Sequence, residues 1–455
     1  MRLAELTGKR MALLGLGVEN QALGEYLLSK GLRFAVCDRQ PEVAVRREWG
    51  DRVEQWRLGP DYLAGLADFE VIWRTPGISP LRPELRAAQA AGARLESQTR
   101  LFVERCPCPL IGVTATKGKG TTSSMLTRIL QESRASGLYL GGNIGLPPIS
   151  FLDALQPTDL VVLELSSFQL QDLEQSPQIA VVVNITQDHL DYHATREEYV
   201  EAKRNICRHQ GPGEVLVVNQ DCPTASGFAH EHPGTVWTFS TIGPVAQGAW
   251  VEAGQLWLRR PGAEGEVVCR VEEIPLRGRH NRENAAAAAT AAAAAGASPA
   301  QIRAGILGFA GLPHRLERVG EYGGVLYYND SLATTPDAAV AALQAFEEPV
   351  VLIAGGSSKG ADFSSLGAQL AAGRVKAVVL LGEEGERIAQ AAVQAGYAGE
   401  LVRGCASMAE AVAQARLRVE PGEVVLLSPA CASFGMFANY KDRGEQFKRA
   451  ACGGG

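Results

Sequence analysis

The residues of this chain best suited to chemistry lie between Thr114 and Thr122, where two lysines alternate with two glycines. An apolar run over residues 109–113 precedes them and indicates a buried strand, and apolar residues at helical spacing follow over residues 121–133. A strand, a glycine-bearing loop and a helix start direct free backbone N–H groups and the positive end of the helix dipole at one point. The segment therefore predicts a phosphate-binding loop.

The side chains of this loop suit a nucleotide phosphate. Lys119 adds a positive charge, and the hydroxyl of Thr121 or Thr122 could reach Mg²⁺. The spacing departs from the general P-loop pattern, which has glycine in place of Val113 and serine or threonine in place of Gly120. An ordinary strand-to-helix turn with a surface lysine is the alternative. A lysine between two glycines at a helix start favours a nucleotide-binding loop over an ordinary turn.

A carboxylate ends the next predicted strand of this region. Residues 159–165 form an apolar run with Glu164 near its C-terminal end, where ligands of α/β sheets bind. Because Mg²⁺ prefers oxygen ligands, Glu164 is a candidate metal ligand beside the phosphate loop. A solvent-exposed acid at the edge of the sheet is the alternative, and the apolar run around Glu164 argues against it.

Two histidines follow a third apolar run, residues 179–185. His189 and His193 have the i, i+4 spacing of a zinc pair, but no glutamate adjoins His189 as metalloprotease chemistry requires. From the spacing alone, we expect solvated loop histidines. A predicted helix comes next, and Lys203 near its middle would ordinarily face solvent.

The first unit of the chain, residues 1–105, carries a weak dinucleotide-binding pattern. One predicted strand leads to Gly15 and Gly17, and a second ends at Asp38, about 20 positions later. Asn20 stands where the pattern has its third glycine. An oxidoreductase with a dinucleotide cofactor fits this outline, and so does a Rossmann-like domain for another phosphate-bearing ligand such as a nucleotide-sugar.

Composition bounds the class of protein. A chain of 455 residues is too long for one hydrophobic core, so we expect two or three domains. With 46% hydrophobic residues and a formal charge of -6, nothing favours nucleic acid or an anionic membrane surface as a partner. The sequence shows no signal peptide and no apolar run long enough to span a bilayer. Nine cysteines without paired zinc spacing fit a reducing cytoplasm.

Alternating helix and strand patterns predict α/β domains in the rest of the chain. Residues 106–311 hold the phosphate loop and a small β insertion between residues 234 and 278, packed on the main sheet. Residues 312–455 predict parallel strands whose ends carry small and charged residues, including Lys359 in a glycine-rich turn. The tail over residues 451–455 is expected to be disordered.

Ten short motifs, taken together, resemble the Mur ligase family of ATP-dependent amide-forming enzymes of peptidoglycan synthesis. They follow the family's order over nearly the whole chain, at residues 114–121, 142–145, 163–170, 188–191, 202–203, 280–281, 311–317, 329–331, 359–363 and 427–433. The resemblance implies an α/β protein of three domains: a Rossmann-like domain for a UDP-sugar (1–105), a P-loop ATPase-like domain for ATP (106–311) and a Rossmann-like domain for the incoming amino acid (312–455).

The resemblance also implies a reaction. ATP phosphorylates the carboxylate of UDP-N-acetylmuramoyl-L-alanine, and the amino group of D-glutamate attacks the acyl phosphate to give an amide, ADP and phosphate. Both steps bring anions together, so the reaction needs cations more than a nucleophilic side chain. Such an enzyme is expected to be a cytoplasmic monomer that binds neither nucleic acid nor the membrane interior.

The resemblance assigns roles to individual residues. Lys119, Glu164, His189 and Lys203 are the implied catalytic residues. Two Mg²⁺ ions are implied, the first held by Thr121 and Glu164 and the second by His189 and a carbamylated Lys203, whose ammonium thereby becomes an anionic ligand. The implied ATP-binding residues are Ala115, Thr116, Lys117, Gly118, Lys119, Gly120, Thr121, Asn284, Arg315 and Asp330. The implied substrate-binding residues are Asp38, Arg39, Thr75, Asn143, Thr334, Lys359, Ser433 and Phe434.

Two positions depart from the pattern of the D-glutamate-adding members of the family. Gly120 replaces a serine or threonine, and Leu332 replaces a lysine that helps the acceptor site. A family member with another acceptor, such as L-glutamate, is therefore an alternative. The alternative from a different class is the dinucleotide-binding oxidoreductase.

Overall fold

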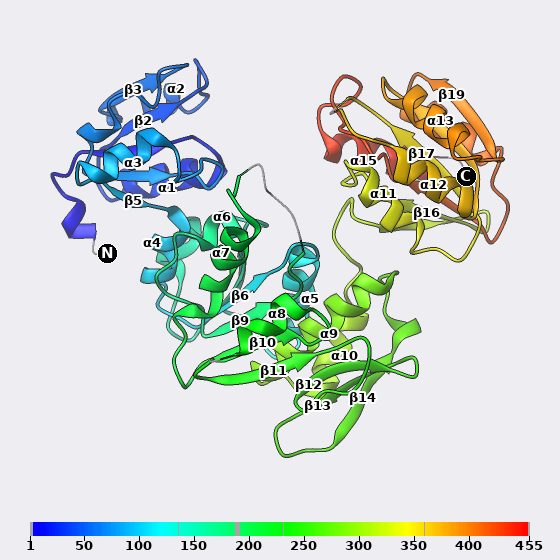
Figure 1. Ribbon diagram of the computed structural model, residues 1–455, viewed down its shortest axis with the longest axis horizontal. Coiled ribbons are helices and arrows are strands. Elements are labelled where there is room, and N and C mark those ends of the chain that lie inside the picture. Colours follow the sequence, from blue (N-terminus) through cyan, green and yellow to red (C-terminus); the bar gives the residue numbers. More distant parts are fainter. Residues whose placement is uncertain (1–2, 135, 187–191, 231, 359, 454–455) are drawn as a thin grey trace. The chain divides into compact units, whose positions relative to one another are not determined.

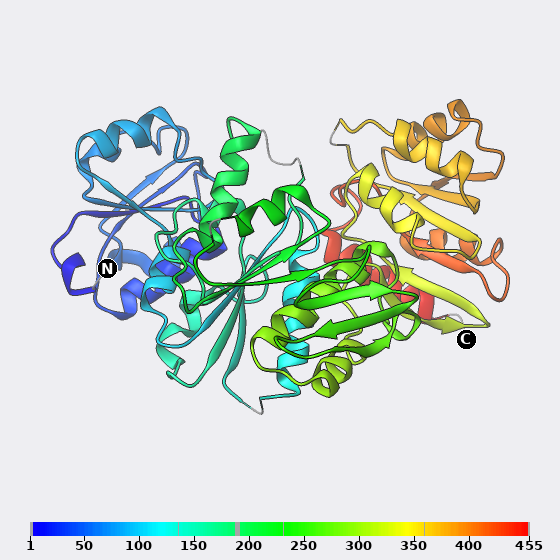
Figure 2. The same cartoon turned by 60° about the horizontal axis from the view of Figure 1, so that its bottom comes forward.

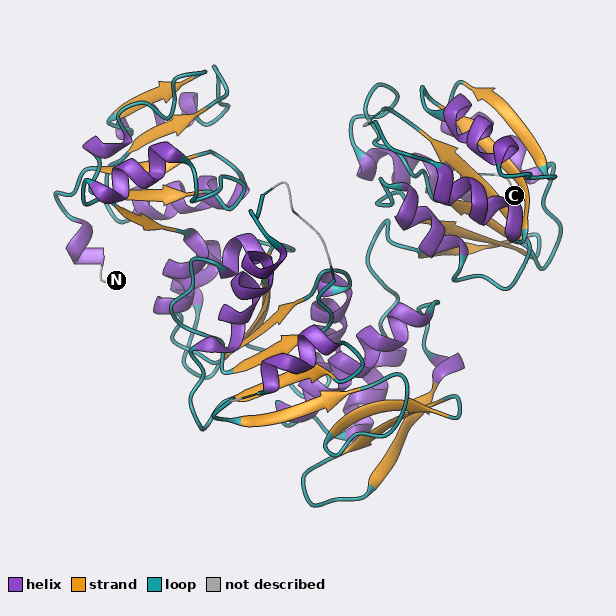
Figure 3. Cartoon of the chain, viewed as in Figure 1, coloured by secondary structure: helices purple, strands orange, loops and turns teal. Residues whose placement is uncertain are grey.

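The computed structural model describes residues 3–134, 136–186, 192–230, 232–358 and 360–453. The chain divides into two compact units, drawn in Figure 1. Unit 1 comprises Met1–Val271 and Glu283–Ile306, and unit 2 comprises Glu272–Arg282 and Leu307–Gly455. Each unit contains predominantly parallel sheets accompanied by helices, as Figure 3 shows, and this confirms the predicted α/β class.

Unit 1 begins with a five-stranded parallel sheet in the order β3-β2-β1-β4-β5. Its strands are β1 (Met11–Leu14), β2 (Ala35–Asp38), β3 (Gln55–Leu58), β4 (Val71–Arg74) and β5 (Arg94–Glu96), and its helices are α1 (Val18–Ser29), α2 (Arg46–Trp49), α3 (Pro83–Ala90) and α4 (Gln98–Arg105). Every residue of β1 and β4 is buried, which is typical of parallel strands covered on both faces. The strand order reverses between β1 and β4, so their C-terminal ends are the expected place for a ligand.

A second, six-stranded parallel sheet in unit 1 has the order β11-β10-β9-β6-β8-β7. Its strands are β6 (Leu110–Thr114), β7 (Leu138–Gly142), β8 (Leu160–Glu164), β9 (Ile179–Val182), β10 (Val215–Asn219) and β11 (Thr235–Phe239). The helices along this part of the chain are α5 (Lys119–Gln131), α6 (Ser167–Leu170), α7 (Arg196–Arg208), α8 (Pro223–Ser226), α9 (Arg279–Ala294) and α10 (Pro299–Leu307).

The predicted β insertion is present but shorter than expected. Strands β12 (Gly248–Glu252), β13 (Gln255–Arg259) and β14 (Gly265–Arg270) form an antiparallel sheet of their own, visible in Figure 2. The first strand of the predicted insertion, β11, instead pairs in parallel with β10 and extends the central sheet. Its sequence shares Val and Trp with the strands of the insertion, so composition could not separate the two.

Unit 2 contains a six-stranded sheet in the order β15-β16-β20-β17-β18-β19. Its strands are β15 (Glu317–Tyr322), β16 (Val325–Asn329), β17 (Val350–Gly355), β18 (Val375–Leu381), β19 (Glu400–Cys405) and β20 (Val424–Leu427). All neighbours are parallel except β15, which pairs antiparallel with β16. The helices are α11 (Pro336–Leu343), α12 (Ser364–Ala372), α13 (Gly385–Gln394), α14 (Met408–Arg416) and α15 (Tyr440–Cys452).

Alternate side chains of β17 enter two cores, one on each face of this sheet. Leu352 and Ala354 belong to a cluster with residues of α11, α12 and α13, whereas Val351 and Ile353 belong to a cluster with residues of α14 and α15. The two-residue period of a strand produces this division. It explains why the buried strands of unit 2 read as continuous apolar runs.

The C-terminal tail differs from its prediction. Helix α15 continues to Cys452, and Ala451 is fully buried in the core against the sheet, so the expected disorder at these two positions is wrong. Alanine carries little hydrophobic signal of its own, and a buried helix end was therefore hard to recognise. The described residues also form short 3-10 helices at Leu3–Leu6, Gly50–Arg52, Leu66–Asp68, Pro148–Ala154, Gly227–Ala229 and Val271–Glu273. Among the helices in the described part of the chain, none has the length and apolar character that a bilayer crossing requires.

Candidate functional site

The predicted phosphate loop connects β6 to α5. Gly118 precedes the first helical residue, Lys119, and has a φ of +91°, a conformation that favours glycine. A Cβ at this position would overlap the side-chain oxygen of Asn284, so the packing also requires glycine. The hydroxyl of Thr122 lies 3.1 Å from that same oxygen. The loop and Asn284, separated by more than 160 positions in the sequence, therefore lie side by side.

Asn184 fixes the main chain of the loop. Its carbonyl oxygen accepts the Thr116 N–H at 2.7 Å, and its side-chain amide both accepts the Lys117 N–H and donates to the Lys117 carbonyl, each at 3.0 Å. The same amide donates to the Glu283 carboxylate at 2.9 Å. Sequence reasoning missed Asn184, because a single polar residue after an apolar run carries no signal that separates a loop support from a turn.

Two ammonium groups meet at one carbonyl of the loop. The Nζ atoms of Lys119 and Lys203 each donate to the carbonyl oxygen of Ala115, and both distances are 2.9 Å. Lys203 is 1% exposed, its Nζ also donates to the hydroxyl of Thr114 at 3.2 Å, and it lies over the ring of Tyr199. The ordinary expectation of a solvent-facing lysine is therefore wrong for Lys203.

Glu164 ends β8 in a buried position and is 3% exposed. Its Oε1 accepts the side-chain N–H of Asn143 at 3.0 Å, whereas its Oε2 is buried and has no hydrogen-bond partner among the described residues. An ionised oxygen left unpaired in a protein interior is costly, and a bound cation would satisfy it. The prediction that Glu164 is buried rather than at a solvated edge is confirmed.

His193 differs from the expectation of a solvated loop histidine. His193 is 1% exposed; its Nε2 lies 3.0 Å from the hydroxyl of Ser167, and its ring packs between Phe168 and Tyr199. This packing gives His193 a structural place in the core. His189 lies outside the described residues. Within the described part of the chain, no three His, Cys, Asp or Glu side chains form a metal cluster.

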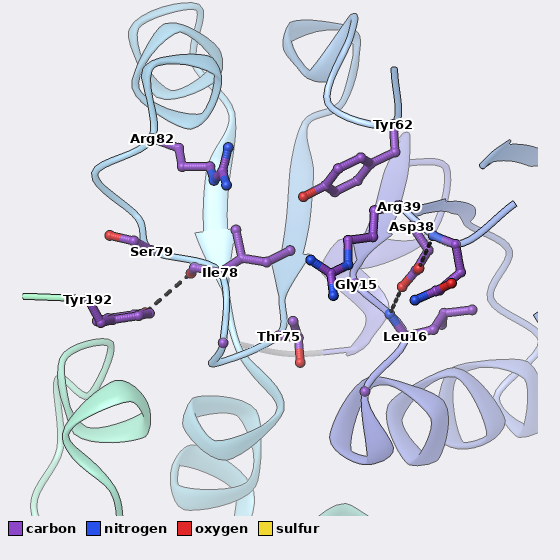
Figure 4. Close-up of a pocket in the computed structure, with 13 residues that line it drawn as sticks. Gly15, Leu16, Asp38, Arg39, Tyr62, Thr75, Ile78, Ser79, Arg82 and Tyr192 are labelled. Atoms are coloured by element: carbon purple, nitrogen blue, oxygen red, sulfur yellow. Dashed lines mark hydrogen bonds between the residues drawn. The ribbon is translucent and has the colours of Figure 1, made fainter. Parts of the chain in front are cut away.

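A cavity of about 500 Å³ opens at the C-terminal ends of β1, β2 and β4, as expected from the strand order (Figure 4). Its lining consists of Gly15, Leu16, Gly17, Asp38, Arg39, Gln40, Tyr62, Thr75, Gly77, Ile78, Ser79, Arg82 and Tyr192. Three of these residues, Asp38, Arg39 and Thr75, are among the substrate-binding residues that the family resemblance implies, and Gly15 and Gly17 belong to the predicted dinucleotide pattern. Arg82 was missed, because a charged residue just before a helix normally predicts only a solvated surface.

The turn after β1, which lines this cavity, explains why Asn20 stands where the dinucleotide pattern has its third glycine. Asn20 is fully buried, and its side-chain N–H₂ group donates to the carbonyl oxygens of Leu14, Gly15 and Trp73 at 2.8–3.1 Å. The amide thus joins the β1 turn to the end of β4. The Asp38 carboxylate accepts the Leu16 N–H at 2.6 Å, which holds the ends of β1 and β2 together.

In unit 2, polar residues gather where β16, β17 and β20 end. The Asp330 carboxylate accepts the Leu316 N–H at 3.0 Å and the Ser428 hydroxyl at 2.9 Å. Burial raises the pKa of the Asp330 carboxyl to about 7, and these hydrogen bonds only partly offset it. Ser433 is buried, Thr334 is half-buried and Phe434 is 62% exposed. Lys359 lies outside the described residues.

Comparison with known proteins decides the family. The family description "Mur ligase MurD-like, N-terminal domain" matches residues 9–96, "Mur ligase middle domain" matches residues 113–292, and "Mur ligase, glutamate ligase domain" matches residues 314–431. A curated protein of Symbiobacterium thermophilum named UDP-N-acetylmuramoylalanine--D-glutamate ligase is 44% identical over 451 residues, which cover 97% of each chain. The chain belongs to the Mur ligase family.

Other Mur ligases support this placement. A protein of the same name from Ruminiclostridium cellulolyticum is 36% identical over 98% of this chain and 96% of its own length. Among solved structures, UDP-N-acetylmuramate-alanine ligase MurC from Thermotoga maritima is 19% identical, with a TM-score of 0.59 over 96% of this chain and 98% of its own. MurF from the same organism, solved in complex with ADP, is 17% identical, with a TM-score of 0.57 over 99% of both chains. These structures share the fold.

The residues that the resemblance assigned to this Mur ligase fall into three groups in the structure. In unit 1, Lys119 and Lys203 share the Ala115 carbonyl as acceptor, Glu164 accepts from Asn143, and Gly118 packs closely against Asn284. Thr121 is buried in the first turn of α5. Asp38, Arg39 and Thr75 line the cavity at the first sheet of unit 1. Arg315, Asp330, Thr334, Ser433 and Phe434 belong to unit 2.

Proposed function

We propose that this Mur ligase joins D-glutamate to UDP-N-acetylmuramoyl-L-alanine, with conversion of ATP to ADP and phosphate, in the synthesis of peptidoglycan precursors. The observation that carries the proposal is the 36–44% identity, over nearly the full length, to proteins named for this activity. The phosphate loop with two converging lysines supports the ATP-dependent step. We expect the enzyme to act as a monomer in the cytoplasm, without nucleic acid or membrane as a partner.

The reaction has two steps, each of which brings anionic substrates together. An oxygen of the substrate carboxylate attacks the γ-phosphorus of ATP, and ADP leaves with the electrons of the broken P–O bond. The amine of glutamate then attacks the acyl carbon; phosphate leaves and the nitrogen loses a proton. Lys119 and the N–H groups at the start of α5 bind the phosphates and lower the repulsion in both steps.

The described residues fit a divalent cation next to the phosphates. The unpaired Oε2 of Glu164 and the hydroxyl of Thr121 would hold one Mg²⁺, and the oxygen character of both matches its preference. Bound Mg²⁺ supplies positive charge to phosphoryl oxygens. A second Mg²⁺ would be held by His189 and by Lys203 in its carbamylated form.

The environment of Lys203 favours a carbamate over an ammonium. Its Nζ is buried, and a second ammonium, that of Lys119, reaches the same carbonyl oxygen. The neutral amine attacks CO₂, an N–C bond forms and one proton is released. The product carries a negative charge beside Lys119 and offers two oxygens to a metal. Burying an ammonium in the protein interior is costly, and this gives the reaction a physical reason.

The three domains divide the substrates between them in this proposal. Residues 1–105 hold the UDP-sugar in the cavity, where the cations Arg39 and Arg82 suit its phosphates and Asp38 and Thr75 offer polar contacts. Residues 106–311 hold ATP, and residues 312–455 hold glutamate. The remaining proposed contacts are Asn143 for the muramoyl group, Asn284, Arg315 and Asp330 for the adenosine, and Thr334, Lys359, Ser433 and Phe434 for glutamate.

Leu332 is the reason to consider a second amino acid as the acceptor substrate. It replaces a lysine expected in the acceptor site of D-glutamate-adding members, so one cation for the glutamate carboxylates is missing. L-glutamate is the alternative acceptor. Purified protein with ATP and UDP-N-acetylmuramoyl-L-alanine should be given D-glutamate, L-glutamate, D-aspartate and glycine in turn, with ADP release as the readout. We expect release with D-glutamate; a rate at least tenfold higher with L-glutamate would assign the protein to the alternative.

A further inference from the structure

Arg74, the last residue of β4, stands directly before the loop that closes one side of the cavity. Four of the five residues from Thr75 to Ser79 line the cavity. Arg74 itself does not line it and is fully buried, with 0% exposure. A buried guanidinium is costly unless its charge and most of its N–H groups are satisfied. Its partners therefore show what the protein uses it for.

The guanidinium of Arg74 holds the main chain of this loop. Its Nη1 donates to the carbonyl oxygens of Thr75 at 3.3 Å, Pro76 at 3.1 Å and, more closely, Ile78. Its Nη2 donates to the carboxylate of Asp172, which balances the charge. One side chain thus fixes three carbonyl groups of a five-residue loop.

Tyr192 contacts the same loop from a distant part of the sequence. Its hydroxyl accepts from Arg74 Nη1 at 2.9 Å and lies within donating distance of the carbonyls of Pro76 at 2.8 Å and Ile78 at 3.2 Å. Figure 4 shows the Tyr192 hydroxyl directed at the main chain near Ile78. The ring packs on Phe168 with a centroid distance of 4.1 Å, which fixes the position of the hydroxyl.

We propose that Arg74 and Tyr192 are positioning residues for the UDP-sugar, a role that rests on the proposed function. By holding the carbonyls of Pro76 and Ile78, they keep the Thr75–Ser79 loop in one conformation, so that its cavity-facing groups are arranged before the ligand arrives. A site ordered in advance loses less conformational entropy on binding, and the gain is in affinity for that ligand alone. ATP and glutamate bind elsewhere in the proposed function and should not depend on this pair.

Tyr192→Phe is the principal test, because it removes one hydroxyl and keeps the ring. The loss of hydrogen bonds to the loop should raise the KM for UDP-N-acetylmuramoyl-L-alanine about 5- to 20-fold. The KM values for ATP and D-glutamate and the kcat should stay within about twofold. Tyr139→Phe is the matched control: Tyr139 is a half-buried tyrosine on β7 that stacks on Phe151 and does not line the cavity. It should leave all three KM values unchanged.

Arg74→Lys gives a second readout that does not depend on turnover. Lysine keeps the charge opposite Asp172 but has no planar fork to reach three carbonyls, so the dissociation constant for UDP, measured calorimetrically, should rise by about tenfold or more. An unchanged UDP affinity, or equal effects on the KM for ATP, would overturn the positioning role. If the wild-type enzyme neither turns over the UDP-sugar nor binds UDP, the proposed function itself fails, and this inference with it.

Discussion

Lys119 and Lys203 donate hydrogen bonds to the same acceptor, the carbonyl oxygen of Ala115, each at 2.9 Å. The two ammonium groups therefore lie within about 6 Å of each other. Two like charges this close in a partly dehydrated site repel each other, and the repulsion falls when anions enter. A phosphate on Lys119 and a carbamate on Lys203 would each supply such an anion. The loop is thus arranged for a high concentration of negative charge.

Lys119→Ala should abolish ligation while the protein stays folded. The lysine is only partly buried and contacts main-chain oxygens, so its loss removes charge at the reacting phosphate rather than core packing. We expect a decrease in kcat/KM for ATP of about a hundredfold or more. Lys9→Ala, at an exposed lysine paired with Glu70, is the control and should behave like the parent. A folded Lys119→Ala enzyme with near-normal turnover would exclude the phosphate role.

Lys203→Ala and Lys203→Arg should both be nearly inactive. Alanine removes the amine that would form the proposed metal-binding carbamate, and arginine keeps a positive charge and cannot form a carbamate. A short carboxylic acid added to Lys203→Ala should restore part of the activity, because it places oxygens in the vacated space. The measurement is ADP release with and without the added acid, with thermal unfolding as the check on folding. Full activity in Lys203→Arg would contradict the carbamate.

Gly118→Ala should weaken ATP binding by about tenfold or more. The φ of +91° costs a non-glycine residue about 1 kcal/mol, and the new methyl group would displace the Asn284 side chain. Gly213→Ala is the matched control, since that glycine is exposed, has no strained φ and faces open space. Binding of an ATP analogue by calorimetry distinguishes the two variants. Equal ATP affinity in both would show that the loop tolerates a side chain at position 118.

The stability of the protein should decrease as pH rises through about 7. Burial raises the pKa of the Asp330 carboxyl from its ordinary 3.8 to about 7, so the folded chain binds this proton more tightly than the unfolded chain. The stabilisation is therefore full below pH 3.8 and is lost as the pH rises through the pKa of Asp330 in the folded chain, about 7. Over that range it amounts to at most about 4 kcal/mol.

Asp330→Asn tests this pH dependence, because the amide cannot ionise. Thermal unfolding between pH 5 and 8.5 should show a clearly shallower decline in the variant than in the parent, with a residual slope from Glu19, whose pKa burial also raises to about 7. Parallel slopes in the two proteins would show that Asp330 ionises normally in the folded chain.

Local sequence pattern indicates strands inside sheets more clearly than strands at an edge. β1, β6, β8 and β17 are buried along their whole length and read as apolar runs. β15 and β19 carry a weaker signal, because each lies at an edge of the unit 2 sheet and exposes much of its surface. An edge strand lacks the continuous apolar run on which the predictions depended.

In the candidate sites, too, local sequence pattern predicts local features but not contacts between distant residues. The glycine and lysine spacing of the predicted phosphate loop is local, so the sequence alone was sufficient to predict it. The contact between Arg74 and Tyr192 joins residues 118 positions apart, and nothing near either residue indicates the other. The burial of Lys203 and His193 likewise depends on how their segments pack, which helical or loop spacing alone does not determine.

The most direct test of the proposed function is whether ATP turnover requires both other substrates. ADP release should be measured with purified protein, Mg²⁺ and ATP, adding UDP-N-acetylmuramoyl-L-alanine and D-glutamate separately and then together, with mass spectrometry of the product. We predict rapid ADP release only when both are present, with one molecule of UDP-N-acetylmuramoyl-L-alanyl-D-glutamate formed for each ADP. ADP release that is independent of either substrate, or no increase in mass of the UDP-sugar, would contradict the assignment.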